Sequence, residues 1–207
     1  MTNYLLSIDP SIKNTGFTLW EKEYKYDKNL NYWPTREYVY CEIHNDNNVS
    51  LKIIKECKNC YENEIIWKPI LISSYSFKQY GVLNFESEIF FNNMKDTNID
   101  LIIERGIFNP KMGRGKETLD HLRDFIAGQF NKLLTKDMLI SPKEWQNWYL
   151  KKYFNKLENK KIWNDKEISF SFTLRLIVEN NWNITISNHD EADSLLIGWY
   201  YLNKEVK

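Results

Sequence analysis

The amino-acid sequence predicts a mixed α/β domain whose sheet has an antiparallel edge and a parallel centre. Two short apolar segments, residues 4–9 and 99–104, have the length of buried strands, and both end on an acidic residue. Segments with a helical spacing of apolar residues follow the second of these strands. Strands gathered at the start, followed by alternating helices and strands, are typical of a mixed sheet flanked by helices.

The first half of the chain is expected to open with three antiparallel strands. Residues 4–9 form the first strand, residues 11–16 (SIKNTG) have the composition of a turn, and a second strand begins at Phe17, which completes a hairpin. Residues 38–43 predict the third strand. Residues 45–76 show no regular period, and short apolar runs within them are compatible with an extra strand or with a loop.

Helices and short strands alternate in the second half of the chain. The spacing of apolar residues predicts a short strand at residues 138–140 and helices at residues 77–94, 119–133 and 168–178. The last of these segments fits either period, and helix is favoured. Ser141 and Pro142 have the N-cap and first-turn character of a helix start. Residues 187–190 (SNHD) have the spacing of a capping box and open the last helix.

The composition excludes several classes of protein. Lys and Arg total 28, as do Asp and Glu, so DNA could be bound only through a local basic patch. Three cysteines do not make a secreted disulfide framework. The sequence shows no signal peptide and no run of about 18 apolar residues that would cross a membrane. We therefore expect a single cytoplasmic domain over residues 1–207, with an insertion at residues 45–76.

Acidic residues mark the ends of both buried strands and the start of the last helix. Asp9 and Glu104 end the strands, while Asp190 and Asp193 stand three residues apart on one face of the helix. Each acid alone is also compatible with a turn former, a surface acid or a helix N-terminal residue. Carboxylates that converge need a cation between them, and their oxygens suit Mg²⁺ or Mn²⁺. Two such ions about 4 Å apart would clamp a phosphodiester for hydrolysis.

The motifs, taken in order, resemble those of the RuvC family of Holliday-junction resolvases, which belongs to the RNase H-like nuclease superfamily. The matching segments are Ile8–Ser11, Thr15-Gly16, Ile102–Glu104, Gly128–Phe130, Ser141–Trp145 and Asp190–Leu195. Ser11 stands where the family usually has Gly, and the stretch between the first two motifs is longer than in common bacterial members. The chain therefore resembles a divergent, phage-type member, whose activity could extend to other branched DNAs.

The resemblance implies an RNase H-like sheet, three antiparallel strands and then parallel strands, flanked by helices. It implies an Mg²⁺-dependent endonuclease that cleaves four-way DNA junctions and leaves 5′-phosphate and 3′-hydroxyl ends. Asp9, Glu104, Asp190 and Asp193 would be catalytic and would bind two Mg²⁺ ions, for which Mn²⁺ substitutes, with Asp9 bridging both. Because a four-way junction has two-fold symmetry, we expect a homodimer with one site per subunit. A phage-encoded protein would act in the cytoplasm of its bacterial host.

Basic and aromatic residues near these motifs predict a DNA-binding surface. Residues 141–161 hold six Lys against two Glu, with Trp145 and Tyr149 among the interleaved aromatic residues, and Arg123 flanks the loop after Glu104. The candidate DNA contacts are Lys13, Phe108, Lys111, Arg114, Lys116, Lys143, Lys151 and Lys152. The lysines are also compatible with a solvated helix face. Phe108 fits core packing as well as an apolar wedge at the centre of a junction.

Two other functions fit part of the pattern. An actin-like ATPase would use Asp9 and the hairpin loop, but it needs a second glycine-containing phosphate loop that a chain with 7 Gly does not offer, so no nucleotide cofactor is expected. A non-catalytic scaffold for branched DNA would not need the acids, whose repulsion would hinder binding. Cys57 and Cys60 have zinc-knuckle spacing, but a structural zinc needs four ligands and only Cys41 and His44 are near, so zinc is not expected.

Overall fold

The computed structural model describes seven stretches of the chain, listed here by residue number: 4–11, 13–24, 65–77, 85–95, 98–106, 114–153 and 165–204. The chain divides into two compact units. One contains Met1–Glu21 and Pro69–Lys207, and the other is Lys22–Lys68. The acidic residues of interest all lie in the first unit, which is described below. The single-domain organisation and the extent of the insertion stay predictions.

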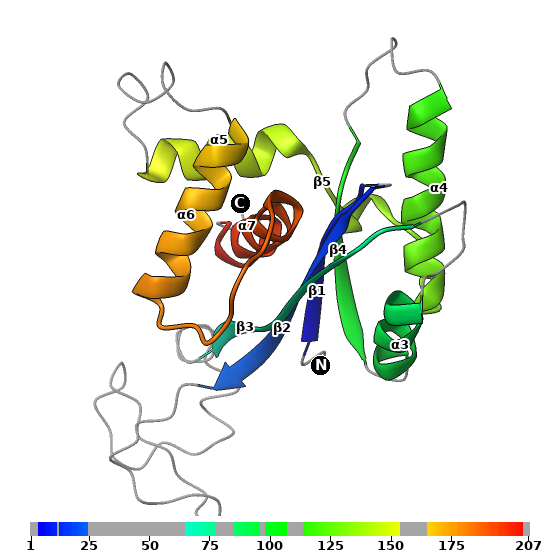
Figure 1. Ribbon diagram of the computed structural model, residues 1–207, viewed down its shortest axis with the longest axis horizontal. Coiled ribbons are helices and arrows are strands. Elements are labelled where there is room, and N and C mark those ends of the chain that lie inside the picture. The colour runs from blue at the N-terminus through cyan, green and yellow to red at the C-terminus, as the bar shows by residue number, and fades with distance from the viewer. Residues whose placement is uncertain are drawn as a thin grey trace, which may run out of the picture. The chain divides into compact units, whose positions relative to one another are not determined.

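The first unit is built around a mixed five-stranded sheet in the order β3-β2-β1-β4-β5 (Figure 1). β1 pairs antiparallel with β2 and parallel with β4, and β4 pairs parallel with β5. The strands are β1 (Tyr4–Asp9), β2 (Thr15–Tyr24), β3 (Ile65–Tyr75), β4 (Ile99–Glu104) and β5 (Leu139–Ile140). This arrangement confirms the predicted mixed sheet, with antiparallel strands followed by parallel ones.

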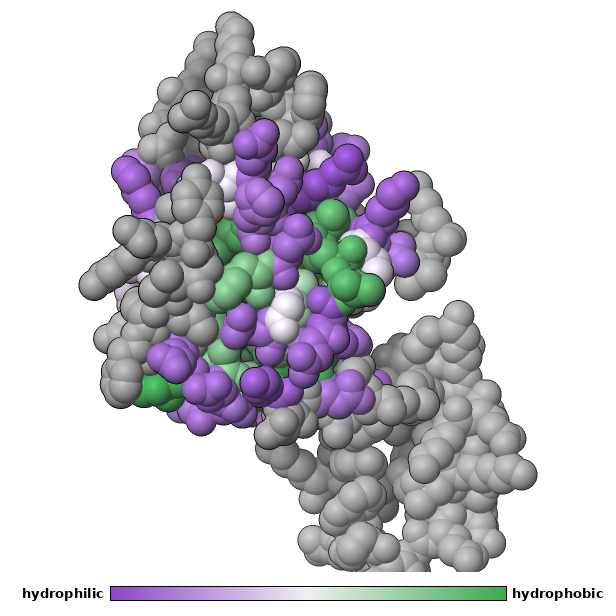
Figure 2. Space-filling view, turned by 90° about the vertical axis from the view of Figure 1, so that its right-hand side faces the viewer, coloured by the Kyte–Doolittle hydropathy of each residue, from purple (hydrophilic) through white to green (hydrophobic). Residues whose placement is uncertain are grey.

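Helices cover both faces of the sheet. The helices of the described part are α3 (Phe85–Met94), α4 (Arg114–Gln129), α5 (Pro142–Tyr153), α6 (Asp165–Glu179) and α7 (His189–Asn203), with a short 3-10 helix η2 (Lys136–Met138) before β5. In Figure 1, α3 and α4 lie on one side of the sheet, and α5, α6 and α7 lie on the other. The side of the molecule that carries α4 is mostly hydrophilic (Figure 2). Within the described ranges, no helix is long and apolar enough to cross a membrane.

The central strand β1 is apolar at all but one of its inner positions because both of its faces are covered. Leu6 and Ile8 belong to the core beneath α3 and α4, which includes Phe91 and Ile126. Ser7 points to the opposite face, where its hydroxyl donates to the carbonyl oxygen of Ser194 in α7 at 2.7 Å. A strand buried on both faces shows little polar alternation, which is why the sequence indicates it so clearly.

The third strand of the sheet differs from the prediction. It is β3, Ile65–Tyr75, and so lies within the stretch that we expected to be an insertion. The segment predicted as the third strand, residues 38–43, lies outside the described residues. β3 is an edge strand, it contains Pro69, and it leaves Ile70 and Leu71 about two-fifths exposed (40% and 37%). An edge strand tolerates proline and needs no apolar alternation, so its sequence signal is weak.

Two predicted helices have other bounds than expected. The first is α3, Phe85–Met94, and residue 77, its predicted start, is not helical. The second, α4, ends at Gln129, and Asn131 follows with a positive φ of 54°. Asn tolerates this left-handed conformation, which ends the helix. Leu133, predicted to lie on the apolar face of that helix, is consequently 88% exposed.

Candidate active site

The sheet register brings two of the predicted acids to one edge. β1 and β4 run parallel, and Ile8 pairs with Ile103, so Asp9 and Glu104 end neighbouring strands at the same level. The third element is the start of α7, which is packed against the hairpin. Gly16, the β2 partner of Asp9, lies so close to this start that a Cβ there would overlap the carbonyl oxygen of Asp190.

The start of α7 is held by a cap that lies one residue later than the predicted Ser187–Asp190 capping box. Asn188 is the N-cap, and its side-chain oxygen accepts the backbone N–H of Glu191 at 3.0 Å. The buried side chain of Glu191 accepts the hydroxyl of Ser74 in β3 at 2.8 Å. The cap therefore fixes both the first turn of the helix and its link to the sheet, and with them the positions of Asp190 and Asp193.

Burial and mutual repulsion disfavour ionisation of three of the acids. The pKa of Asp9 is raised well above its ordinary value, first by burial and then by the charges of Glu104, Asp193 and Asp190. Burial, with the charge of Asp193, raises the pKa of Glu104 to about 7. Burial also raises the pKa of Asp193 to about 6, with a smaller contribution from Asp190. The four predicted acids thus form one interacting group, called the acidic cluster below.

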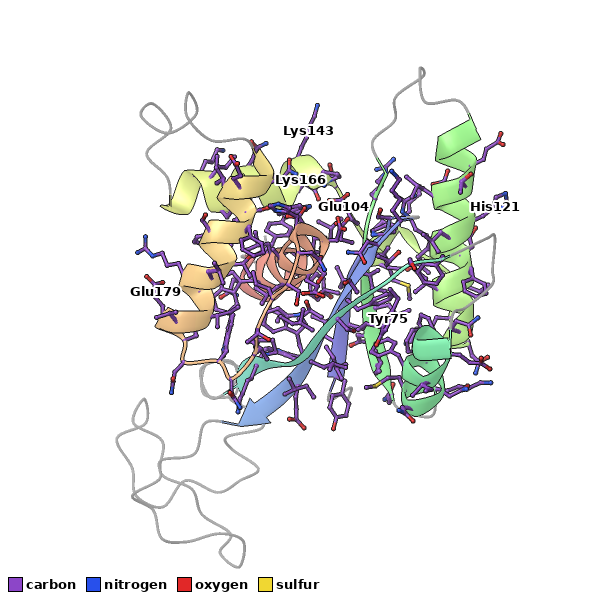
Figure 3. The ribbon with its side chains drawn as sticks, viewed as in Figure 1. Tyr75, Glu104, His121, Lys143, Lys166 and Glu179 are labelled. Carbon is purple, nitrogen blue, oxygen red and sulfur yellow. The ribbon has the colours of Figure 1, made fainter. Side chains whose placement is uncertain are left out.

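The residues around the acidic cluster include donors and a cation. Asp190 accepts the side-chain amide of Asn14, which lies in the turn between β1 and β2, at 3.0 Å. Lys166, in the first turn of α6, lowers the pKa of both Asp9 and Asp193 through its charge. Figure 3 shows Lys166 and Glu179 at opposite ends of α6. Lys166 carries no sequence signal because it is remote along the chain from every acid that it faces.

Three residues assigned by sequence to the DNA-binding region lie in the interior instead. Trp145 is 1% exposed, and its indole N–H donates to Oε2 of Glu104 at 2.8 Å. Arg123 is 3% exposed, and its Nε donates to the carbonyl oxygen of Glu104 at 2.8 Å. Tyr149 is also buried. Arg123 stands four residues after Leu119 and three before Ile126, so the helical spacing already placed it on the apolar face of α4.

The donor atoms of the acidic cluster fit a hard divalent cation in kind. They are all carboxylate oxygens, which Mg²⁺ and Mn²⁺ prefer. Oδ1 of Asp193 is buried and has no hydrogen-bond partner among the described residues, and such an atom is costly unless something pairs with it. As the side chains stand, no group of three or more His, Cys, Asp or Glu residues in the described ranges is arranged to hold a metal ion.

The predicted DNA contacts are only partly described. Lys13 is exposed in the turn that follows β1, and Lys143 and Lys151 are exposed on α5. The backbones of Arg114, Lys116 and Lys152 lie in α4 and α5. Phe108 and Lys111, together with Cys41, Cys57 and Cys60, lie outside the described residues. The roles of all these residues stay predictions.

Comparisons with known proteins found similar solved structures. No family model matches the sequence, and no curated protein matches it. The fowlpox virus resolvase in complex with Holliday-junction DNA is 15% identical, with 99% of each chain covered and a TM-score of 0.44. RuvC of T. thermophilus bound to a Holliday junction is 7% identical, with 96% of this chain and 94% of the other covered and a TM-score of 0.48. A further T. thermophilus RuvC structure is 10% identical, with 96% and 95% covered and a TM-score of 0.46.

Proposed function

We propose that this protein is a divalent-metal-dependent endonuclease that hydrolyses phosphodiesters in branched DNA, with the four-way Holliday junction as its substrate. The acidic cluster is the observation that carries the proposal. Three separate elements bring Asp9, Glu104 and Asp193 together, and burial with the charge of a neighbouring acid raises the pKa of each. Burying like charges lowers stability, so such an arrangement is best explained by a function that needs a cation there.

In this proposal, Asp9, Glu104, Asp190 and Asp193 hold two Mg²⁺ ions, for which Mn²⁺ substitutes. When bound, the ions would activate the attacking water and stabilise the leaving oxygen of the phosphodiester. Asn14 orients Asp190 through its 3.0 Å hydrogen bond. Lys166 places a positive charge beside Asp9 and Asp193, which reduces the repulsion among the carboxylates and offers a contact to a phosphate.

DNA binding is proposed to use the exposed lysines near the acidic cluster. Lys143 and Lys151 lie on α5, and Lys13 lies in the turn next to Asp9. Ammonium groups spaced along such a surface would contact the DNA backbone without reading its sequence. A homodimer with one site per subunit would cut two strands of the two-fold symmetric junction.

The test is cleavage of a labelled, immobile four-way junction by the wild-type protein in Mg²⁺ and in EDTA. Asp9→Asn removes one charge of the acidic cluster while keeping the shape of the side chain. Asp137→Asn makes the same chemical change at an exposed acid in η2, before the start of β5. We expect paired, symmetric nicks that need Mg²⁺, disappear in Asp9→Asn and persist in Asp137→Asn.

Other outcomes separate the alternatives. Equal cutting of flaps, forks and junctions would keep the hydrolytic chemistry and replace junction selectivity by a general debranching activity. Tight binding of the junction without cleavage, by wild type and Asp9→Asn alike, would reject the enzyme and leave a scaffold that binds branched DNA.

A further inference from the structure

Two helices on opposite sides of the sheet hold Glu104 through different groups. From α5, the indole N–H of Trp145 donates to Oε2 of the Glu104 side chain at 2.8 Å. From α4, Nε of Arg123 donates to the carbonyl oxygen of Glu104 at 2.8 Å. Figure 1 shows α4 and α5 on either side of β4, the strand that Glu104 ends. The main chain and one side-chain oxygen of this acid are therefore both fixed.

Both donors are themselves restrained. Trp145 stacks on Tyr149 with a centroid distance of 5.8 Å, and Tyr149 stacks on Phe172 of α6 at 5.4 Å and 11°. Arg123 forms an ion pair with Asp120 at 2.9 Å on its own helix. All three rings of the stack are buried, so the indole has little freedom to turn away from Glu104.

We infer that Trp145 is a positioning residue of the proposed active site. Its indole N–H donates to Oε2 of Glu104, which leaves Oε1 as the oxygen that would bind a cation. This inference rests on the proposed function, because it assigns Glu104 a role there. A neutral donor suits this task, since it orients the carboxylate without cancelling the charge that a cation needs. Partners of this kind around metal-binding residues commonly change metal affinity or activity by about 10- to 100-fold when removed.

The alternative is that the Trp145 hydrogen bond is purely structural and serves only to pair the N–H of a buried indole with an acceptor. Trp20 provides the comparison within the same molecule: it is fully buried, and its indole donates to the hydroxyl of Ser7 at 2.9 Å. The Trp145 bond differs in having an ionisable acceptor, and a hydrogen bond to a carboxylate is shorter and stronger than one to a neutral oxygen. An experiment that follows individual indole protons separates the two roles.

The experiment is nuclear magnetic resonance of the protein with ¹⁵N-labelled indoles, of which the sequence has eight. Trp145→Phe and Trp20→Phe assign two of the resonances. We expect the Trp145 resonance to move in Glu104→Gln, and to move again when Mg²⁺ is added to the wild-type protein, while the Trp20 resonance stays in place. Glu104→Gln keeps an acceptor oxygen for the indole, and both shifts are read on proteins that contain Trp145, so Trp145→Phe serves here only to assign the resonance.

Activity provides the second readout. Trp145→Phe is expected to need about tenfold more Mg²⁺ for half-maximal junction cleavage, with unchanged junction affinity. Trp182→Phe is the matched control, because Trp182 is also buried but packs against Trp20 and Trp199, with centroid distances of 5.7 and 5.3 Å. This control is expected to keep the wild-type Mg²⁺ dependence.

Two results would overturn the inference. One is a Trp145 resonance that shifts neither in Glu104→Gln nor on addition of Mg²⁺, and the other is a folded Trp145→Phe protein with the wild-type Mg²⁺ dependence of cleavage.

The proposed function is rejected by a different result. If the wild-type protein cuts no branched DNA in Mg²⁺, the nuclease is rejected, whereas a Trp145 resonance that responds to Glu104→Gln and to Mg²⁺ still supports the positioning of Glu104.

Discussion

Replacing Glu104 by Gln is expected to stabilise the metal-free protein at neutral and alkaline pH. Burial raises the pKa of Glu104 from an ordinary value of 4.5 to about 7 in the folded protein. At about 1.4 kcal/mol for each pH unit, ionised Glu104 lowers the free energy of unfolding by about 3 kcal/mol. Glutamine carries no charge and keeps an oxygen for the indole of Trp145, so the variant avoids this loss.

The sign of the effect follows from the two protonation equilibria. Below pH 4.5, Glu104 is protonated in the folded and the unfolded protein, and its pKa shift has no effect on stability. As the pH rises, the unfolded state releases this proton first, so the wild-type protein loses stability until the pH passes about 7. The advantage of Glu104→Gln therefore grows between these values and is constant above them.

The assay is urea unfolding of wild type and Glu104→Gln in EDTA, at about pH 4 and about pH 8. Glu179→Gln is the control. Glu179 is exposed and paired with Arg175 on the surface of α6, so its removal is expected to change stability by less than about 1 kcal/mol. The reasoning is refuted if Glu104→Gln is no more stable than wild type at the higher pH, or if the difference is the same at both pH values.

Three further variants test how the acidic cluster is built. Gly16→Ala places a Cβ against the carbonyl of Asp190, so we expect a loss of about 1–3 kcal/mol in urea unfolding and a large loss of cleavage, whereas Gly128→Ala, with nothing within 4 Å, leaves both within error. Saturating Mg²⁺ is expected to raise the wild-type melting temperature and to raise that of Asp193→Asn much less; equal shifts would argue against a cation at the cluster. Ser194→Ala removes a buried hydroxyl that bonds Thr18 at 2.7 Å, which is expected to cost about 1–3 kcal/mol, measured by chemical unfolding.

Several parts of the fold follow from local sequence patterns. β1 and β4 were predicted because each is a short, mainly apolar run that ends on an acid, and a strand covered on both faces is mostly apolar. The start of α7 was predicted to within one residue because a cap is a property of a few consecutive residues: the N-cap is Asn188, which accepts the N–H of Glu191, rather than Ser187. β3 was left open between a strand and a loop, because an edge strand places few demands on its side chains.

The sequence by itself determined that acids stand at the ends of two buried strands and at the start of a helix, since strand ends and helix caps are read from neighbouring residues. Only the tertiary structure decided what surrounds those acids. Trp145 meets Glu104 across 41 positions of the chain, and Asn14 meets Asp190 across 176. The spacing of apolar residues within one segment gives no information about contacts between residues so far apart in the chain. Which side chains face a carboxylate depends on how α5, α6 and α7 pack on the sheet, and this packing also turned Trp145 and Arg123 inward from the surface that their chemistry suggested.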